Sequence, residues 1–159
     1  MKTEKTNACR FLDKKKIAYQ ILTYQVTDKE FIGHGHIHLT EEDPKTLYKT
    51  LVAVGKSNKN YVFMLPYLQT IDLKLAAKSV NEKNISLIKQ KDLFSLTGYV
   101  RGGCSPLGMK KHFTTVVDSS VFSNSYVVFS GGKIGLSIKM LTKDFKKLDI
   151  KSYTITCGE

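Results

Sequence analysis

The C-terminal third of the chain alternates short β-type segments with turn glycines, and this pattern constrains the fold more than any other feature. Segments rich in β-branched and aromatic residues are predicted there as the strands Thr114–Asp118, Tyr126–Gly132 and Lys133–Met140. Further strands are predicted at Ile17–Val26, Tyr48–Gly55, Tyr61–Tyr67, Ile85–Ile88 and residues 151–157. Strands outnumber helices and are joined mainly by hairpins. The sequence therefore predicts an α+β fold with a mixed, mostly antiparallel, curled sheet surrounded by helices.

Four helices are predicted around this sheet. The clearest is Asp72–Val80, where apolar residues recur every three or four positions and Asp72 can cap the N-terminus. The others are Thr6–Lys16, Lys91–Gly98 and Thr142–Leu148. No linker, repeat or low-complexity tract divides the chain, so residues 1–159 are expected to form a single domain.

The excess of basic over acidic residues indicates what kind of partner the chain binds. The 159 residues include 25 Lys+Arg and 14 Asp+Glu, a formal net charge of +11. This excess favours a polyanionic partner through long-range attraction and counterion release. The longest apolar stretch, Tyr61–Leu68, is far shorter than the roughly 20 residues that span a bilayer. We therefore expect a soluble, cytoplasmic protein without a membrane partner.

The cysteines support the same compartment. Cys9, Cys104 and Cys157 are widely spaced, and none belongs to a CxxC pair. This spacing is typical of reduced thiols in the cytosol and argues against a disulfide framework or a zinc knuckle. The basic N-terminal segment is followed by no apolar run, so no signal peptide is expected.

A histidine-rich segment offers one candidate site. In an extended segment, His34, His36 and His38 would share a face and could converge on a metal ion. No acidic fourth ligand follows at a characteristic spacing. A solvated polar loop is the stronger interpretation, and a metal-dependent hydrolase stays open as an alternative.

Cys104 offers a second candidate, because a thiol in a glycine loop resembles a nucleophile. Its nearest base by sequence is His112. No third, orienting group is evident, so we favour a small half-buried residue that lines a turn.

Two glycine pairs and one lysine complete the candidates. The pairs Gly102–Gly103 and Gly131–Gly132 fit neither a dinucleotide fingerprint nor a P-loop, although paired glycines can present backbone N–H groups to a ligand. Spacing alone favours hairpin turns. Lys49 stands where a polar loop enters an apolar strand and could hold a phosphate, but spacing alone does not separate it from other surface lysines.

Taken together, these segments resemble the YbaK/EbsC family, free-standing relatives of the editing domain of bacterial prolyl-tRNA synthetases. The resemblance rests on TGYVRGGCSPLGMKKHFTTVVD (Thr97–Asp118), YKTLV (Tyr48–Val52) and SGGKIGL (Ser130–Leu136), and it covers nearly the whole chain. Within the family the chain looks closest to the Cys-tRNA(Pro)/Cys-tRNA(Cys) deacylase branch. The resemblance implies a partly barrel-like editing-domain fold.

The resemblance also implies residue roles. Lys49 matches the essential lysine, thought to hold the phosphate of the terminal adenosine and therefore the 3′ end of the tRNA. The other matches line the substrate pocket: Tyr24, Gly102, Gly103, Ser130 and Gly131. Ser137 stands where many relatives carry an acid, often Asp, which removes a charge from that wall. The histidine segment differs from the family's more helical counterpart, and this weakens the metal hypothesis.

The implied activity is trans-editing: removal of cysteine from Cys-tRNA(Pro) and Cys-tRNA(Cys) without a cofactor, by attack of the substrate's own thiol. The implied partners are an aminoacyl-tRNA, with its 3′ end in the pocket, and prolyl-tRNA synthetase in a transient complex. Three alternatives stay open. They are a deacylase that uses water on another small amino acid, a non-catalytic tRNA-binding module, and the metal-dependent hydrolase.

Overall fold

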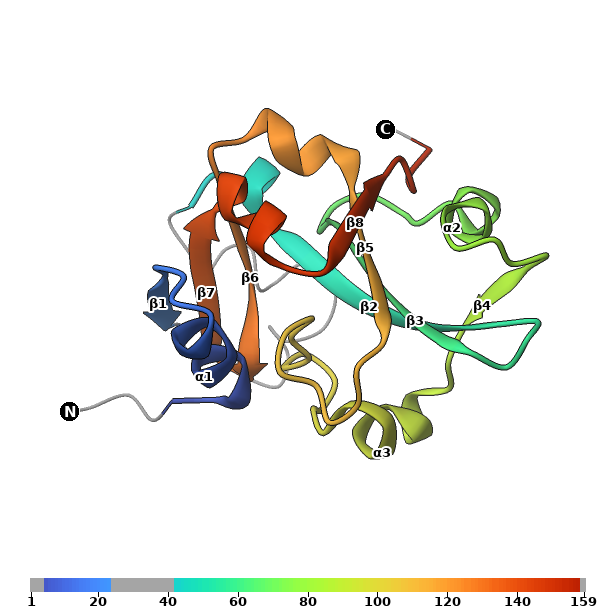
Figure 1. The fold of residues 1–159 in the computed structure, drawn as a ribbon, viewed down its shortest axis with the longest axis horizontal. Coiled ribbons are helices and arrows are strands. Elements are labelled where there is room, and N and C mark those ends of the chain that lie inside the picture. Colours follow the sequence, from blue (N-terminus) through green and yellow to red (C-terminus); the bar gives the residue numbers. More distant parts are fainter. Residues whose placement is uncertain (1–4, 24–41, 158–159) are drawn as a thin grey trace.

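The computed structural model describes residues 5–23 and 42–157, and its helices and strands follow the predicted α+β pattern (Figure 1). The helices are α1 (Asn7–Lys14), α2 (Leu73–Ser79) and α3 (Leu93–Thr97). The strands are β1 (Gln20–Thr23), β2 (Tyr48–Gly55), β3 (Asn60–Pro66), β4 (Ile85–Leu87), β5 (Thr114–Asp118), β6 (Tyr126–Lys133), β7 (Leu136–Leu141) and β8 (Ile150–Tyr153). None of the described helices is long and apolar enough to cross a membrane.

The described strands form two sheets. The three-stranded sheet has the order β1-β7-β6 and is antiparallel throughout. The five-stranded sheet has the order β4-β2-β3-β5-β8, in which β3–β5 and β5–β8 are parallel pairs and the other two pairs are antiparallel. The prediction of a mixed, mostly antiparallel arrangement is therefore confirmed.

The two sheets approach each other where β2 begins. Leu47, directly before β2, forms an isolated parallel bridge with Val128 in β6. In Figure 1 the three-stranded sheet and α1 lie on the left, and β2 crosses the centre toward the rest of the larger sheet. Within the described residues the sheets do not close into a complete barrel, which agrees with the partly barrel-like expectation.

The largest buried cluster connects α1 with both sheets. It contains apolar residues from α1, β2, β3 and β5 through β7, among them Leu12, Tyr48, Met64, Phe129 and Ile138. A second cluster packs α2 on the other face of the larger sheet through Ala76, Ala77, Phe63 and Leu65. Apolar side chains on both faces of β2 and β3 are therefore buried. Close packing on both faces fixes the position of these two strands in the larger sheet.

The helix ends follow the sequence signals. The Thr6 hydroxyl accepts a hydrogen bond from the Cys9 backbone nitrogen, 3.2 Å away, at the start of α1. The Asp72 carboxylate caps α2 in the same way. Gly98 ends α3 with φ +82°, a left-handed conformation that glycine adopts without steric cost. The three corresponding helix predictions are confirmed, with small differences at their ends.

Three expected boundaries were wrong. Gly131 and Gly132 lie inside β6 at a β-bulge, and the turn falls instead at Ile134 and Gly135, so β7 starts later than Lys133. The segment Thr142–Lys147 forms 3₁₀ turns rather than an α-helix. The last strand, β8, ends at Tyr153, before the predicted end of the 151–157 segment.

Candidate active site

Two serines from neighbouring strands share one face of the smaller sheet. Ser130 in β6 is paired with Ser137 in β7, and Ser137 is paired in turn with Leu22 in β1. Directly opposed residues in antiparallel strands point to the same side. Their sequence neighbours Phe129 and Ile138 are buried in the main core. The row from Ser130 to Leu22 therefore lies on the face of this sheet that is turned away from that core.

The bridge between the sheets brings Lys49 to this same row. Lys49 and Ser130 each stand two residues beyond the bridged pair, Leu47 and Val128, and a parallel bridge sends both chains in one direction. Because side chains alternate along a strand, Lys49 shares a face with Leu47, and Ser130 shares a face with Val128. Leu47 and Val128 pack together with Leu22, Tyr67 and Tyr126. These apolar side chains form one cluster beside the bridge that precedes Lys49 and Ser130 in their strands.

Lys49 is half-buried in this setting, and none of the described residues supplies a compensating charge. No carboxylate in residues 5–23 or 42–157 forms an ion pair with its ammonium group. Burial lowers the pKa of Lys49 from its ordinary value, because the charged form loses hydration. A cation placed in this way is available for an anionic ligand, such as a phosphate.

The Gly102–Gly103 loop reaches the far end of β6. A Cβ atom on Gly103 would lie 2.9 Å from the Ile134 nitrogen and 3.1 Å from the Lys133 carbonyl carbon. Gly102 has φ +82°, a conformation that suits glycine. The structure thus brings together the two glycine-containing segments that the sequence had singled out separately.

The other side of this loop borders a cavity of about 230 Å³. Its walls come from β2, from the end of β4 and the segment leading into α3, and from the loop, through Thr50, Leu51, Val52, Leu87, Ile88, Gln90, Leu93, Arg101, Gly102 and Cys104. Gly102 and Cys104 therefore lie across a cavity from β2. The β2 residues that line this cavity are the three that follow Lys49 in the chain.

Thr50 was not singled out by the sequence, although it borders the cavity. Its hydroxyl oxygen is buried, and it makes no hydrogen bond within the described part of the chain. Buried hydroxyl groups are nearly always paired, so an unpaired one beside a cavity is unusual. The only sequence signal would have been a polar residue between Lys49 and Leu51 in an otherwise apolar strand.

Gly131 has a structural environment different from that of Ser130. It lies on the opposite face of β6, where the Leu136 side chain occupies the space that a Cβ atom would need. Its carbonyl oxygen accepts a hydrogen bond from the Thr6 hydroxyl at the start of α1. Gly131 therefore connects β6 to α1, and a contact with substrate would have to come from the remaining backbone atoms of this bulge.

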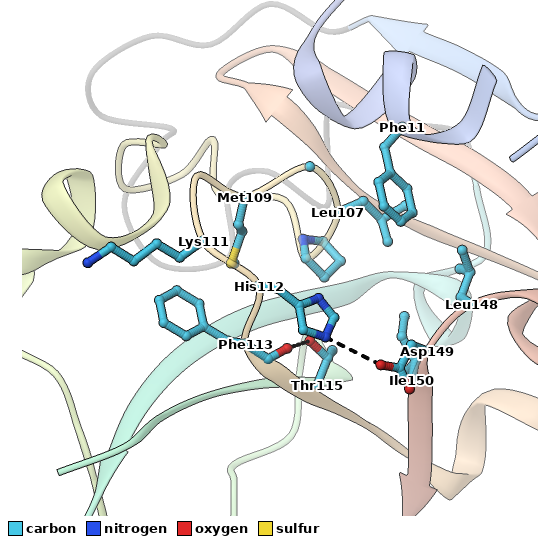
Figure 2. Close-up of a pocket in the computed structure, with 12 residues that line it drawn as sticks. Phe11, Leu107, Met109, Lys111, His112, Phe113, Thr115, Leu148, Asp149 and Ile150 are labelled. Carbon is cyan, nitrogen blue, oxygen red and sulfur yellow. Dashed lines mark hydrogen bonds and ion pairs between the residues drawn. The ribbon is translucent and has the colours of Figure 1, made fainter. Parts of the chain in front are cut away.

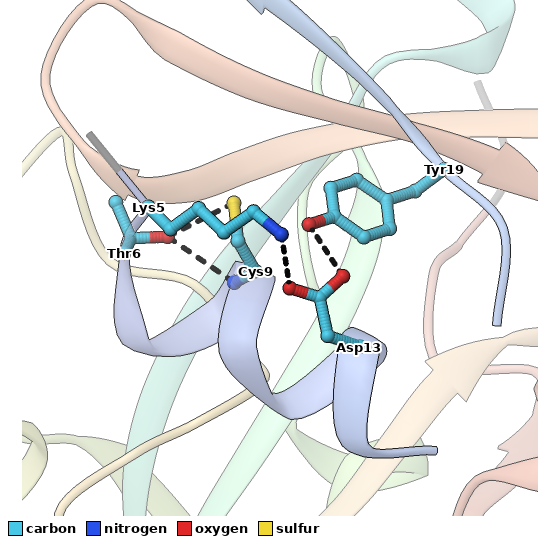
Figure 3. Close-up of polar contacts among 5 residues, drawn as sticks. All are labelled: Lys5, Thr6, Cys9, Asp13 and Tyr19. Atoms are coloured by element: carbon cyan, nitrogen blue, oxygen red, sulfur yellow. Dashed lines mark hydrogen bonds and ion pairs between the residues drawn. The ribbon is translucent and has the colours of Figure 1, made fainter. Parts of the chain in front are cut away.

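The start of α1 is itself held in place by side-chain contacts (Figure 3). The Thr6 hydroxyl contacts the Cys9 backbone and sulfur. At the other end of the helix, Asp13 accepts hydrogen bonds from Lys5 at 2.6 Å and from the Tyr19 hydroxyl at 3.0 Å. These bonds lower the pKa of Asp13, the one from Lys5 most strongly. These contacts hold α1 in place, and the N-terminal cap of this helix, Thr6, hydrogen-bonds the Gly131 carbonyl oxygen.

The structure does not bring the proposed Cys104–His112 pair together. Cys104 is buried, and burial raises the pKa of its thiol to about 11, so the thiol is protonated at neutral pH. His112 is exposed and forms an ion pair with Asp149 at 3.3 Å. It lines a separate cavity with Phe11 and Leu148, where Figure 2 shows its ring turned toward Asp149. A nucleophile–base pair is therefore absent from this part of the described structure.

One cation lies beside the serine row. Lys139, two residues after Ser137 and on the same face of β7, forms an ion pair with Glu42 at 2.8 Å. Its ammonium group also lies 4.1 Å from the centre of the Tyr126 ring. The strand that holds Ser137 thus carries a positive charge nearby, and that charge is already paired with Glu42.

Four predicted residues lie outside the described parts of the chain: Tyr24, His34, His36 and His38. Tyr24 follows the described part of β1 directly. Among the residues that are described, no group of His, Cys, Asp and Glu side chains has the arrangement of a metal site.

Comparison with known proteins places this geometry in context. Residues 38–148 match the family model of the aminoacyl-tRNA editing domain. The chain is 34% identical over 137 residues to EbsC of Enterococcus faecalis, which is named as a candidate Cys-tRNA(Pro)/Cys-tRNA(Cys) deacylase; the match covers 86% of this chain and 84% of that protein.

Solved structures show the same fold. A crystal structure described as a candidate trans-editing enzyme for prolyl-tRNA synthetase superposes with a TM-score of 0.79 at 17% identity, covering 98% of this chain and all of the other. The crystal structure of a protein described only as hypothetical gives a TM-score of 0.83 at 14% identity, covering 95% and 99% of the two chains. At these identities the likeness concerns the fold alone.

Proposed function

The chain belongs to the family of aminoacyl-tRNA editing domains, and we propose that it is a deacylase that removes cysteine from Cys-tRNA(Pro) and Cys-tRNA(Cys). The observation that carries this proposal is the position of Lys49. It is a half-buried lysine, unpaired within the described structure, two residues beyond the bridge that joins its strand to the strand of Ser130. The name of the 34% identical relative supports cysteine as the amino acid.

In this proposal Lys49 binds the phosphate of the terminal adenosine. A charge-assisted contact to phosphate is among the stronger polar contacts, and the partial burial of Lys49 strengthens it further. The contact would place the ester between the residues of the two walls. Ser130 and Ser137 lie on one side, and the Gly102–Gly103 loop lies on the other. The Gly103 N–H donates a hydrogen bond to the Val100 carbonyl oxygen at 3.0 Å, so the Gly102 N–H is the donor that this loop offers to the ester. Oriented N–H groups stabilise the negative charge that develops on an attacked carbonyl oxygen.

The attacking group is then the substrate's own thiol. Its sulfur bonds to the carbonyl carbon while the bond from that carbon to the ribose oxygen breaks. The thiol proton ends on the departing ribose oxygen, and the products are a cyclic thioester and free tRNA. Tethering gives the thiol a high effective concentration, and it ionises far more readily than an alcohol. The high pKa of Cys104 and its separation from His112 support a mechanism without a protein nucleophile.

The proposal extends to the setting of the protein. We place the whole chain, residues 1–159, in a single editing domain that acts in the cytoplasm on free or synthetase-bound tRNA. A transient complex with prolyl-tRNA synthetase would bring the enzyme to newly mischarged Cys-tRNA(Pro). The net charge of +11 supports binding of tRNA by either route.

Single-turnover deacylation of Cys-tRNA(Pro) tests the proposal. We expect Lys49→Ala to slow the reaction about tenfold to a hundredfold, which corresponds to the roughly 1.5–3 kcal/mol of a hydrogen bond to a charged group. Lys56→Ala is the matched control, since Lys56 is an exposed lysine in the turn that follows the same strand. A folded Lys49→Ala protein as active as the wild type would overturn the assignment.

A further inference from the structure

An exposed aromatic side chain lies on α3, close to the candidate site. Phe94 is 63% exposed, the largest exposed fraction among the large apolar residues of the described chain. Its neighbour Leu93 is turned inward and packs with the cluster that contains Val52 and Cys104. The helix therefore separates the two side chains, with Leu93 anchoring α3 and Phe94 presented to solvent. Exposure of the apolar Phe94 ring to water is unfavourable in free energy, whereas a polar side chain at this position would carry no such penalty.

The helix that carries Phe94 borders the cavity described above. Leu93, directly before Phe94, lines that cavity, and so does Gln90, which lies one turn earlier. The Arg101 guanidinium donates a hydrogen bond to the Gln90 side-chain oxygen at 3.1 Å, and Arg101 lines the cavity as well. A ligand that leaves the cavity on this side meets Arg101 and α3 first.

The charges around Phe94 are mainly positive. Lys89 and Lys91 are exposed in the turn that leads into α3, and Arg101 is exposed on the loop beside it. Asp92 is the acidic residue of this segment. Exposed aromatic rings in a positively charged segment are the means by which proteins bind single-stranded nucleic acid, with bases stacked on the rings and phosphates near the cations. An apolar protein partner would not require these cations.

We propose that the single-stranded CCA end of the tRNA crosses α3 on its way to the site, with a base that precedes the terminal adenosine stacked on Phe94. This inference rests on the proposed function, because it takes an aminoacyl-tRNA as the substrate. Arg101, Lys89 and Lys91 then lie near the phosphates of the same strand. The stack positions the 3′ end but takes no part in breaking the ester.

A binding experiment tests this without depending on catalysis. The affinity of the protein for uncharged tRNA(Pro) is compared with its affinity for the same tRNA trimmed of its CCA end, by fluorescence anisotropy. We expect the wild type to bind the intact tRNA more than about tenfold more tightly, because one base–aromatic stack contributes about tenfold and the contact of Lys49 with the terminal phosphate adds to it. Phe94→Ala should lower this preference about tenfold and bind the trimmed tRNA as the wild type does. Phe94→Trp should keep the preference.

Phe122→Ala is the matched control. Phe122 is also a strongly exposed phenylalanine, 53% exposed, but it lies in the 3₁₀ turns after β5 and packs against Phe145. Its replacement should leave the preference for the CCA end unchanged. A Phe94→Ala variant that keeps the full preference would overturn the inference and leave the deacylase proposal standing, because that proposal is tested by ester cleavage. A wild type that binds both tRNAs equally would overturn the inference as well, and it would also contradict the contact between Lys49 and the terminal phosphate.

Discussion

Gly103 packs against the backbone of Ile134 so closely that a Cβ atom at this position would lie 2.9 Å from the Ile134 nitrogen. The contact joins the loop before β5 to the turn between β6 and β7. These two segments form different parts of the candidate site. The distance between their backbones can be this short because Gly103 has no side chain. Backbone atoms cannot rotate away as the end of a side chain can, and the added methyl group would have to push the segments apart.

We therefore expect Gly103→Ala to reduce both activity and stability. Overpacking of this kind costs about 1–3 kcal/mol, and the displaced loop should slow deacylation of Cys-tRNA(Pro) by at least about tenfold. Thermal unfolding and single-turnover kinetics measure the two effects. Gly98→Ala is the comparison: at φ +82° it is strained, but its Cβ would meet only the Lys110 side chain at 3.6 Å. That variant should lose stability and keep its catalytic rate constant.

Lys49→Met should separate stability from activity. The half-buried ammonium group gives up hydration without an ion-pair partner in the described structure, so its removal should leave the melting temperature unchanged or slightly higher. Deacylation should fall at least about tenfold, because methionine cannot bind phosphate. Thermal melts and activity assays on the same preparation measure both. A marked loss of stability would show that Lys49 serves the fold.

The difference in stability between the wild type and Lys49→Met should depend on pH, because the pKa of Lys49 is lowered in the folded protein. Between its folded value and its unfolded value, the unfolded chain binds more protons at this group than the folded chain, so stability rises with pH. Below the folded pKa the full cost of burying the charge is present. The wild type should therefore be least stable relative to Lys49→Met near neutral pH, and the gap should narrow in alkaline solution. A gap that widens with rising pH would contradict the assigned burial.

Cys104 should be dispensable for the chemistry. Its thiol is buried with a pKa of about 11, so little thiolate exists at neutral pH. Cys104→Ala should retain most of the activity, with a stability loss of about 1 kcal/mol for the small cavity it leaves. In the wild type, thiol reagents should modify the exposed Cys157 first and Cys9 and Cys104 only slowly. Trapping of a covalent aminoacyl thioester on Cys104 would refute this prediction.

Thr50→Val should distinguish an unused hydroxyl group from a structural one. The Thr50 hydroxyl is unpaired within the described chain, so its loss should cost no stability, and kcat/KM should fall several-fold if the hydroxyl contacts the substrate. In Thr115→Val, by contrast, a hydrogen bond to the Phe113 carbonyl is lost, and stability should fall by about 1 kcal/mol. Equal destabilisation by both substitutions would mean that Thr50 has a structural partner.

Much of the secondary structure could be predicted because local signals agree with it. The apolar run of β2 ends at an exposed turn, and Asp72 and Gly98 mark helix ends by caps that depend on neighbouring residues alone. The turn after β6 was misplaced because Gly131 and Gly132 look like a hairpin turn. In the structure they form a bulge, and the turn glycine is Gly135.

The assembly of the site could not be predicted in the same way. The segments that carry Lys49 and Ser130 come together at the bridge between Leu47 and Val128. This bridge joins strands of different sheets that lie far apart in the sequence. Gly103 meets Ile134 across a similar gap. No periodicity or spacing encodes such contacts, and the resemblance to a known family supplied the residues without their geometry. The isolation of Cys104 from His112 likewise became visible only in three dimensions.

The central claim is that a cysteine esterified to tRNA supplies its own nucleophile in a pocket organised around Lys49. The most direct test is side-by-side deacylation of Cys-tRNA(Pro) and Ser-tRNA(Pro), on the same tRNA and under matched single-turnover conditions. The two amino acids differ by one atom, so they should fit the pocket almost equally well. We expect the cysteinyl ester to be cleaved at least about a hundredfold faster, because only the thiol ionises readily enough to attack. Equal rates would contradict the account and would identify water as the attacking group.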